Sequence, residues 1–418
     1  MKKLIVLLLL SASSAMAQDM GGTAGMDMPK DSDADTCMAM HGAFGRYAMN
    51  RDASGTSWQP DLGPAMGQMT MLDDWMLMSR LALWGIYDYQ SGPRGGEMVY
   101  PAGMVMGMAQ RDFGDGTLGF RAMLSPDALM GRSGYPLLLE SGETADGVTP
   151  LIDRQHPHDL FMELASSYSQ KLNDQTSAFL YVGYPGEPAL GPTAFMHRAS
   201  AMDDPAAPIT HHWLDSTHVT FGVATFGLVL GDWKLEVSQF TGREPDKFRF
   251  NFDPPRMDST SARISYNPDE HWSLQTSWGH LNSPELLEPT TDETRYTASA
   301  TYVTDFGEES SLASTVAWGQ KSLSTGPRLN GLLAEAELKP ADLWTVFSQA
   351  EWEENAELVS GRVSRVGDFV LGGIRDFSLA DHWKFGVGGL YAFDFTPGNA
   401  SYGNTPHGAI AFVRILAE

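Results

Sequence analysis

Six of the eleven histidines lie between residues 156 and 218, together with several acidic residues. The residues concerned are His156, His158, Asp159, His197, Asp203, Asp204, His211, His212, Asp215 and His218. Two or three neutral imidazoles with a carboxylate form a site for Cu(II), Zn(II), Ni(II) or Fe(II). The segment therefore predicts a transition-metal site, with the six histidines and Asp159 as candidate ligands.

The spacing within this segment assigns different roles to neighbouring histidines. His156 and His158 flank Pro157 and lie at i and i+2, which places both rings on one side of an extended chain. His211 and His212 are adjacent and cannot point the same way in an extended chain, so we expect one to be a ligand and the other to pack or to orient it. Asp159 and Asp215 are expected either to bind the metal or to orient a ring.

Two alternative roles for the same residues remain open. The histidines could hydrogen-bond to one another and only hold two long loops together. Alternatively, Ser216, His218 and Asp215 supply the residue types of a hydrolase, as in outer-membrane lipases. Because Ser216 and His218 are two residues apart on one predicted strand and the chain has no G-x-S-x-G elbow, we expect no enzyme activity.

A second group of metal-binding residue types lies near the amino terminus. The sequences MGGTAGMDM and CMAMHG contain Met26, Met28, Cys37, Met38, Met40 and His41. Thioether, thiol and imidazole ligands at short spacing suit Cu(I), which is a soft ion. The alternative is that methionine is simply frequent in this segment.

The amino terminus also indicates the cellular address. Residues 1–17 combine two lysines, a leucine-rich run and the sequence Ala15-Met16-Ala17, which together are typical of a cleaved secretory signal peptide. The chain has one cysteine and therefore cannot form an internal disulfide. Its 52 acidic and 28 basic residues argue against a nucleic-acid partner and are compatible with the handling of cations.

Elements that could position the histidines begin after a Met-, Gly- and Asp-rich extension that we assign to residues 18–75. From residue 76 to 418, segments of about ten residues alternate apolar with small or polar side chains, as transmembrane β-strands do. Sixteen such segments are predicted. They begin near residues 77, 103, 117, 159, 176, 216, 228, 259, 271, 294, 310, 330, 343, 362, 383 and 405.

The connections between these segments alternate between short turns and longer loops. Outer-membrane barrels have short periplasmic turns, longer outer loops and an even number of strands. We therefore predict an all-β, antiparallel transmembrane barrel of about 16 strands in the bacterial outer membrane, with a short Met-rich periplasmic extension. The six histidines should then gather at the outer mouth. Arg111 is expected to face the lumen, so the alternating Met104, Met106 and Met108 are predicted to face lipid.

This layout resembles the outer-membrane proteins of bacterial copper-resistance systems, which combine a signal peptide, a Met- and His-rich periplasmic head and a carboxyl-terminal barrel. The resemblance rests on residues 1–17, on MGGTAGMDM with CMAMHG, and on the barrel from residue 76. It implies copper binding or efflux, with outer-membrane lipid, a metal ion and periplasmic copper-handling proteins as partners. Zinc or another divalent metal is the alternative ion, and a general porin is the alternative function.

Overall fold

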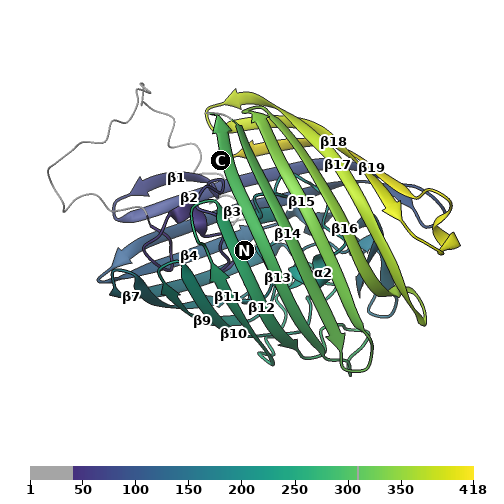
Figure 1. The fold of residues 1–418 in the computed structure, drawn as a ribbon, viewed down its shortest axis with the longest axis horizontal. Helices are drawn as coiled ribbons and strands as arrows, with labels where there is room; N and C mark the ends of the chain where they lie inside the picture. Colours follow the sequence, from purple (N-terminus) through teal and green to yellow (C-terminus); the bar gives the residue numbers. More distant parts are fainter. Residues whose placement is uncertain (1–40, 308–309) are drawn as a thin grey trace, which may run out of the picture. The chain divides into compact units, whose positions relative to one another are not determined.

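Sixteen strands form one closed antiparallel barrel in the computed structural model, which describes residues 41–307 and 310–418 (Figure 1). Each strand pairs with its neighbour along the chain, and β19 closes the barrel by pairing with β2. The strands are β2 (Trp75–Gln90), β3 (Gly96–Phe113), β4 (Gly116–Leu124), β7 (Phe161–Asn173), β8 (Thr176–Gly183), β9 (Val223–Leu230), β10 (Trp233–Phe240), β11 (Ser259–Tyr266), β12 (Trp272–Leu281), β13 (Glu293–Gly307), β14 (Ser310–Leu323), β15 (Arg328–Ala341), β16 (Trp344–Val359), β17 (Arg362–Ala380), β18 (Trp383–Phe395) and β19 (His407–Ala417).

The side-chain alternation of these strands is that of a membrane barrel. In β10, Lys234 and Glu236 are buried in the lumen, whereas Leu235 and Val237 are exposed on the outside. A closed barrel leaves no strand edge unpaired, and apolar side chains on its outer face are compatible with lipid. The predicted fold class and the predicted outer-membrane localisation are confirmed. No helix among the described residues is long and apolar enough to cross a membrane.

The predicted strand starts agree with the structure to within two residues for all but three strands. The clearest error concerns the sixth strand, which was predicted from residue 216 but begins as β9 at Val223. A strand that alternates from residue 216 would place Val219 and Phe221 against lipid, but both side chains are buried inside the barrel. The next strand was predicted from residue 228, which lies within β9, and the turn to β10 follows at Gly231. The misleading signal was an apolar alternation that continues from the preceding loop into the strand.

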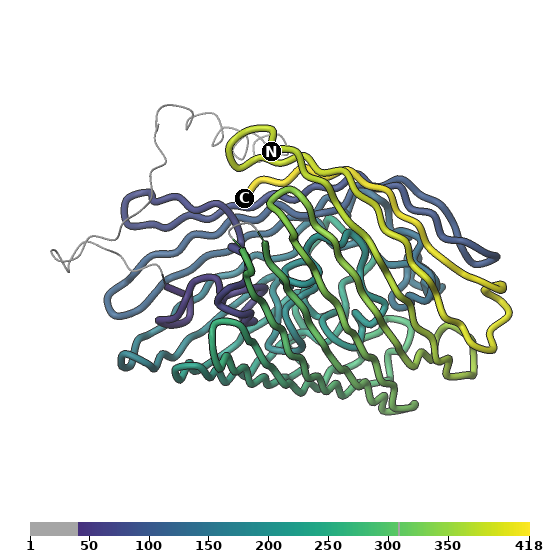
Figure 2. Tube along the Cα trace, turned by 45° about the horizontal axis from the view of Figure 1, so that its top comes forward, coloured from purple at the N-terminus to yellow at the C-terminus, as the bar shows by residue number. Residues whose placement is uncertain are grey.

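Three segments fold into the lumen. The first comprises residues 41–66, which precede β1 (Gln68–Leu72) and include the 3-10 helix η1 (Met49–Arg51). The second connects β4 to β7 and contains a hairpin of β5 (Tyr135–Thr144) and β6 (Pro150–Gln155). The third, residues 184–222, connects β8 to β9 and is called the inward loop below; Figure 2 shows the teal chain enclosed by the barrel strands. Its short helices are η3 (Phe195–His197), α2 (His211–Leu214) and η4 (Ser216–His218).

The inward loop is fixed to the opposite wall by buried polar contacts. Arg198 Nε donates to Glu335 on β15 at 2.5 Å, and Arg198 Nη2 donates to the same carboxylate at 3.1 Å. The backbone nitrogens of Ile209 and Thr210 donate to Glu351 on β16 at 2.9 and 2.8 Å. The loop therefore crosses the lumen, and its side chains are held away from the membrane face.

The prediction that Met104, Met106 and Met108 face lipid is wrong. Met104 and Met106 are each 5% exposed and belong to a buried cluster on the lumen side of β2, β3 and β4. The prediction used Arg111 as a marker of the lumen face. Arg111 lies near the end of β3, where its guanidinium is 3.7 Å from Asp74 and stacks over Trp75, so a charge at a strand end does not report which face is internal.

Candidate metal centre

Five of the six histidines predicted as ligands form a continuous chain of ring contacts inside the barrel. The ring centroids of His156 and His212 are 5.6 Å apart, and those of His212 and His211 are 5.4 Å apart. His211 is in turn 5.1 Å from His218, which is 5.1 Å from His158. The chain joins the connection after β6 to helices α2 and η4 of the inward loop. The histidines are thus brought together as predicted, but within the lumen instead of at the outer rim.

Three of these imidazoles share one hydrogen-bonding pattern. His158 Nδ1 is 2.7 Å from Asp127 Oδ2, and His211 Nδ1 is 2.8 Å from Asp215 Oδ1. His218 Nδ1 is 2.8 Å from the backbone oxygen of Asp215, which can only accept, so this nitrogen carries the hydrogen. An oxygen partner at Nδ1 fixes the ring and leaves the Nε2 lone pair free, as it does for histidines that bind metals.

The free Nε2 atoms lie close together. His158 Nε2 and His218 Nε2 are 3.0 Å apart, and His211 Nε2 is buried without a hydrogen-bond partner. The ring of Phe195 lies beside all three imidazoles, at centroid distances of 6.4, 5.6 and 6.2 Å from His158, His211 and His218. This arrangement, called the imidazole site below, offers nitrogen ligands against an apolar wall.

Asp215 connects the imidazole site to the barrel. Its Oδ1 contacts His211, while its Oδ2 accepts from the backbone nitrogen of Phe195 at 2.7 Å and lies 3.2 Å from Arg198 Nη1. Because Arg198 also binds Glu335, the position of the His211 ring depends on the ion pair that fixes the inward loop to the barrel wall. Orienting a ring is one of the two roles expected for Asp215. Asp127, which contacts His158 in the same way, was not singled out from the sequence.

A second group of ligand types surrounds the other end of the histidine chain. Ligand atoms of His212, Glu244 and Glu285 all lie within 4.8 Å of one another. His212 Nδ1 is 3.4 Å from Glu244 Oε1, and His212 Nε2 is 3.5 Å from Glu140 Oε1. His156 Nδ1 is 3.3 Å from Glu143. This arrangement, called the carboxylate site, contains four acids that the sequence did not single out. They lie in long connections, and only the fold brings them to His212.

The electrostatics of both groups favour a bound cation. Burial lowers the pKa of His156, His212 and His218 well below the usual imidazole range, so these rings are neutral and can act as ligands. Burial, together with the neighbouring Glu244 carboxylate, raises the pKa of Glu285 well above its usual range. The nearby positive charges are Lys321, Arg295 and Arg249. Arg295 already pairs with Glu293 at 2.7 Å, and Arg249 Nη2 donates to Glu143 at 2.5 Å. A divalent cation would stabilise the ionised acids.

Two predicted ligands do not join the chain of histidines. Asp159 lies 3.4 Å from Arg249 Nη1 and pairs with that arginine. His197 lies in η3 of the inward loop and is 1% exposed, with no hydrogen-bond partner at either ring nitrogen. Burial and the charges of Arg80 and Arg121 lower the pKa of His197 to about 3.

The predicted amino-terminal ligands fall mostly outside the described residues. Met26, Met28, Cys37, Met38 and Met40 all precede residue 41.

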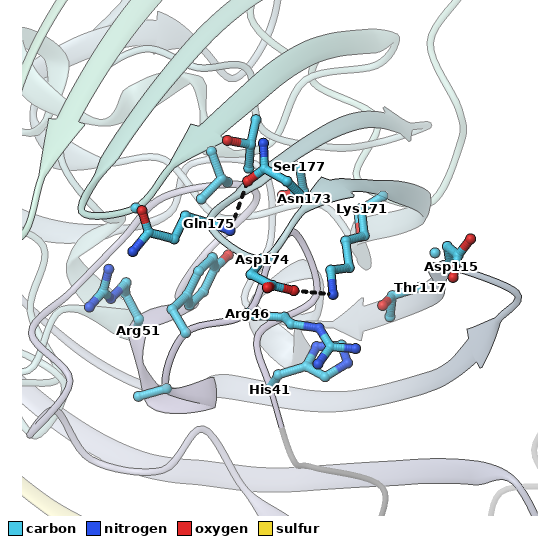
Figure 3. Close-up of a pocket in the computed structure, with 18 of the residues that line it drawn as sticks. His41, Arg46, Arg51, Asp115, Thr117, Lys171, Asn173, Asp174, Gln175 and Ser177 are labelled. Carbon is cyan, nitrogen blue, oxygen red and sulfur yellow. Dashed lines mark hydrogen bonds and ion pairs between the residues drawn. The ribbon is translucent and has the colours of Figure 1, made fainter.

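His41 is described and lines a cavity of about 350 Å³ at the barrel end that carries the short turns (Figure 3). Its Nε2 is 3.2 Å from Asp112, and its Nδ1 is 2.8 Å from the backbone oxygen of Gly42. Lys171 and Asp174 form an ion pair of 2.6 Å in the same cavity. The cavity is therefore lined by charges of both signs.

The side chains of Ser216 and His218, which were considered for a hydrolase, contact other residues and not each other. Ser216 Oγ accepts from Arg295 Nη1 at 3.0 Å, whereas His218 contacts Asp215 and His158. The nucleophile and base of a catalytic triad need a direct hydrogen bond, and these two side chains do not form one in the described structure.

Comparisons with known proteins establish the class of fold. The chain is similar to an anion-selective porin from Comamonas acidovorans, with 11% identity, a TM-score of 0.52, and coverage of 82% of this chain and 99% of that chain. It is also similar to OmpF of Salmonella typhi in complex with daunomycin, with 9% identity, a TM-score of 0.52, and coverage of 84% and 100%. No protein-family model matches the chain. A search of curated proteins likewise found no match.

The protein is therefore a porin-like barrel of the outer-membrane type. This confirms the barrel fold that the resemblance to copper-resistance proteins implied. The more specific expectation of copper is not carried by either solved structure, because neither is described as a copper protein. At identities near 10% the likeness concerns the fold, and the function has to be argued from the lumen.

Proposed function

We propose that this outer-membrane barrel binds a divalent transition-metal ion in its lumen, with copper as the expected ion and zinc as the alternative. The observation that carries the proposal is the convergence of His158 Nε2 and His218 Nε2 to 3.0 Å while each Nδ1 is anchored to oxygen. On a tetrahedral ion with metal–nitrogen distances of about 2.0–2.1 Å, two ligand nitrogens lie about 3.3 Å apart. A shift of a few tenths of an ångström would therefore admit an ion.

The competing hypothesis is that the histidines only bind each other. Since His218 Nδ1 carries its hydrogen, His158 would have to supply the proton between the two Nε2 atoms. His158 Nδ1 faces the Asp127 carboxylate and would need a second hydrogen to donate there. A purely structural role thus requires one additional proton, on one of the two imidazoles or on the Asp127 carboxyl, whereas a metal-bound pair needs only neutral rings.

A general porin is the second candidate function. The fold likeness to an anion-selective porin and to OmpF supports this candidate more directly than it supports metal binding. The inward loop argues for a restricted lumen because it is anchored to β15 and β16 on the far side. Conductance in planar lipid bilayers separates the candidates. A general porin gives a large conductance that is unaffected by Zn(II), whereas occupation of the imidazole site should reduce any conductance that passes through the lumen.

Metal binding can be measured on the purified full chain by equilibrium dialysis against Zn(II) and Cu(II), with bound metal determined by mass spectrometry. The His158→Gln/His218→Gln variant keeps polar side chains of similar size and should lose the ion of the imidazole site. The matched control is His382→Asn, which changes an exposed turn histidine with positive φ at a position that asparagine tolerates. Heat-modifiable mobility on gels verifies that each barrel is folded. Unchanged metal content in the folded double variant would refute the proposal.

A metal ion bound in the lumen would be compatible with a role in metal resistance or transport. Periplasmic copper-handling proteins are then the expected partners on the side of the short turns. Growth of a deletion strain on copper, with complementation by the wild-type gene and by the double histidine variant, tests the role. Equal growth of all strains would separate metal binding from resistance.

A further inference from the structure

The lumen wall formed by β2, β3 and β4 carries a concentration of buried methionines. Barrel lumens are usually polar, and other parts of the wall here carry buried charged residues such as Glu335 and Glu351. The methionine cluster consists of Met66, Met78, Met104, Met106, Met123 and Met162, which are each at most 6% exposed, with Met108 and Met196 packed against them.

The strand register explains why these side chains meet. Met104, Met106 and Met108 alternate along β3 and therefore share one face. Met108 lies directly opposite Met78 on β2, and Met106 lies directly opposite Met123 on β4. Directly opposed residues of antiparallel strands have Cβ atoms about 5 Å apart, so the thioethers form one continuous surface.

Part of this surface encloses a small cavity. The cavity has a volume of about 20 Å³, which is close to the space of a single water-sized probe. Six methionines contribute to its lining, namely Met49, Met66, Met76, Met78, Met106 and Met108. Thioether sulfur is a soft ligand that selects soft cations such as Cu(I), whereas oxygen-ligated ions such as Mg²⁺ prefer other sites.

The charges near the cavity permit a cation. Arg121 lines the cavity, but its Nη1 donates to the backbone oxygens of Ala53 and Gly55 at 3.0 and 2.6 Å and lies 3.9 Å from the Glu163 carboxylate. Asp52 also lines the cavity and contributes a negative charge. The positive charge of Arg121 is therefore balanced by two acids.

His197 is next to Met196, which packs against the methionine cluster, but His197 does not line the cavity. Its imidazole is 1% exposed, and both ring nitrogens lack a hydrogen-bond partner. The arginines whose charges act on it, Arg80 and Arg121, lie directly opposite Met106 and Met108 in the strand register. A buried imidazole without partners is costly, but because His197 is not part of the cavity lining, we assign the ligands of the cavity to its methionines alone.

We propose that the methionine-lined cavity is a second metal site, specific for a soft monovalent cation such as Cu(I) or Ag(I). This inference does not rest on the imidazole site, because the two sites use different side chains. The carboxylate site is built from long connections at one end of the barrel, whereas Met76 and Met108 lie towards the short-turn end of β2 and β3. The lumen thus offers nitrogen and oxygen ligands towards one end and sulfur ligands towards the other.

Silver binding to the purified full chain tests the inference, since Ag(I) is soft and does not change oxidation state. The Met78→Leu/Met106→Leu variant removes two sulfurs from the cavity at nearly constant volume, a type of exchange that usually costs less than about 1.5 kcal/mol. It should lose the Ag(I) held by the cavity and keep its Zn(II). The matched control, Met104→Leu/Met162→Leu, changes buried cluster methionines that do not line the cavity and should keep its Ag(I).

The proposal is overturned if the folded Met78→Leu/Met106→Leu variant binds Ag(I) with the stoichiometry and affinity of the parent. If this variant does not fold, the proposal can still be tested on the unmodified chain. With methyl-labelled methionine, Ag(I) should shift cavity methionine resonances in the nuclear magnetic resonance spectrum, while the exposed Met69 and Met71 report non-specific binding. Shifts confined to exposed or amino-terminal methionines would contradict the proposal. If the unmodified chain binds Ag(I) but no Zn(II), only the imidazole site is refuted.

Discussion

The imidazole site and the methionine-lined cavity are both buried in the same lumen, but they are built in opposite ways. The imidazole site depends on the inward loop, whose position is fixed by ion pairs such as Arg198 with Glu335. The cavity is lined in equal parts by barrel strands, whose register places Met78 opposite Met108, and by residues 49–66 of the segment that precedes β1. A loop-borne site can be lost without loss of the barrel, whereas the strand-borne methionines of the cavity should stay together as long as the strands pair.

The largest expected effect comes from Arg198→Ala. Removal of this buried cation leaves Glu335 and Asp215 uncompensated, which typically costs about 3–5 kcal/mol. We expect the inward loop to detach, Zn(II) binding to be lost, and Ag(I) binding to remain. Dialysis with both metals measures the separation. Arg365→Ala is the control, because Arg365 has a 72% exposed side chain. Simultaneous loss of both metals in a folded Arg198→Ala barrel would show that the sites are not separate.

Acidification should also separate the two sites. Imidazole binds metal only when neutral, so protons compete with Zn(II), whereas thioether sulfur has no proton to gain in this range. Because burial lowers the pKa of His218 well below its usual range, Zn(II) should be retained at pH 6.5 and released at a lower pH. Ag(I) in the methionine cavity should remain bound throughout. Metal content measured across a pH series checks this expectation, and parallel release of both ions would contradict it.

The Glu285→Gln substitution should have two smaller effects, which act in opposite directions on the metal-free and the Zn(II)-bound protein. Burial and the neighbouring Glu244 raise the pKa of the Glu285 carboxyl, so in the metal-free protein its ionised form is unfavourable. The amide should therefore stabilise the metal-free protein near neutral pH by about 1 kcal/mol. It should also reduce the stabilisation that Zn(II) provides at the carboxylate site. Thermal unfolding with and without Zn(II) measures both changes. If the metal-free variant is less stable than the metal-free parent, the negative charge of Glu285 is already compensated by the protein.

The smallest effect is expected from Phe195→Leu. Phe195 contacts His158, His211 and His218 but has no ligand atom. A smaller apolar side chain should loosen the rings at a cost of about 1 kcal/mol, without changing the number of bound Zn(II) ions. Isothermal titration gives affinity and stoichiometry in one experiment. A change in stoichiometry would mean that Phe195 determines whether the site forms.

The fold was largely predictable from sequence because strand alternation and turn length are local properties. The starts of β8, β11, β14, β17 and β18 were predicted at the observed residue. The inward loop was not predictable, since its direction is set by Glu335 and Glu351, which lie more than a hundred residues further along the chain. For that reason the histidines were expected at the rim.

The composition of the site was only partly visible in the sequence. The concentration of histidines predicted that His158, His211 and His218 would meet, because each lies near the end of a connection between neighbouring strands. Glu140, Glu244 and Glu285 come from three different connections and carry no local signal. The methionine face was visible as an alternation in β3, but Arg111 was a misleading guide to its direction.

The most direct test is the location of Zn(II) by anomalous X-ray scattering from crystals of the full chain equilibrated with the ion. We predict a peak about 2.0–2.1 Å from the Nε2 atoms of His158 and His218, with His211 as the third ligand. A lumen without a peak at these atoms, or peaks only at exposed histidines such as His382, would contradict a metal centre at the imidazole site.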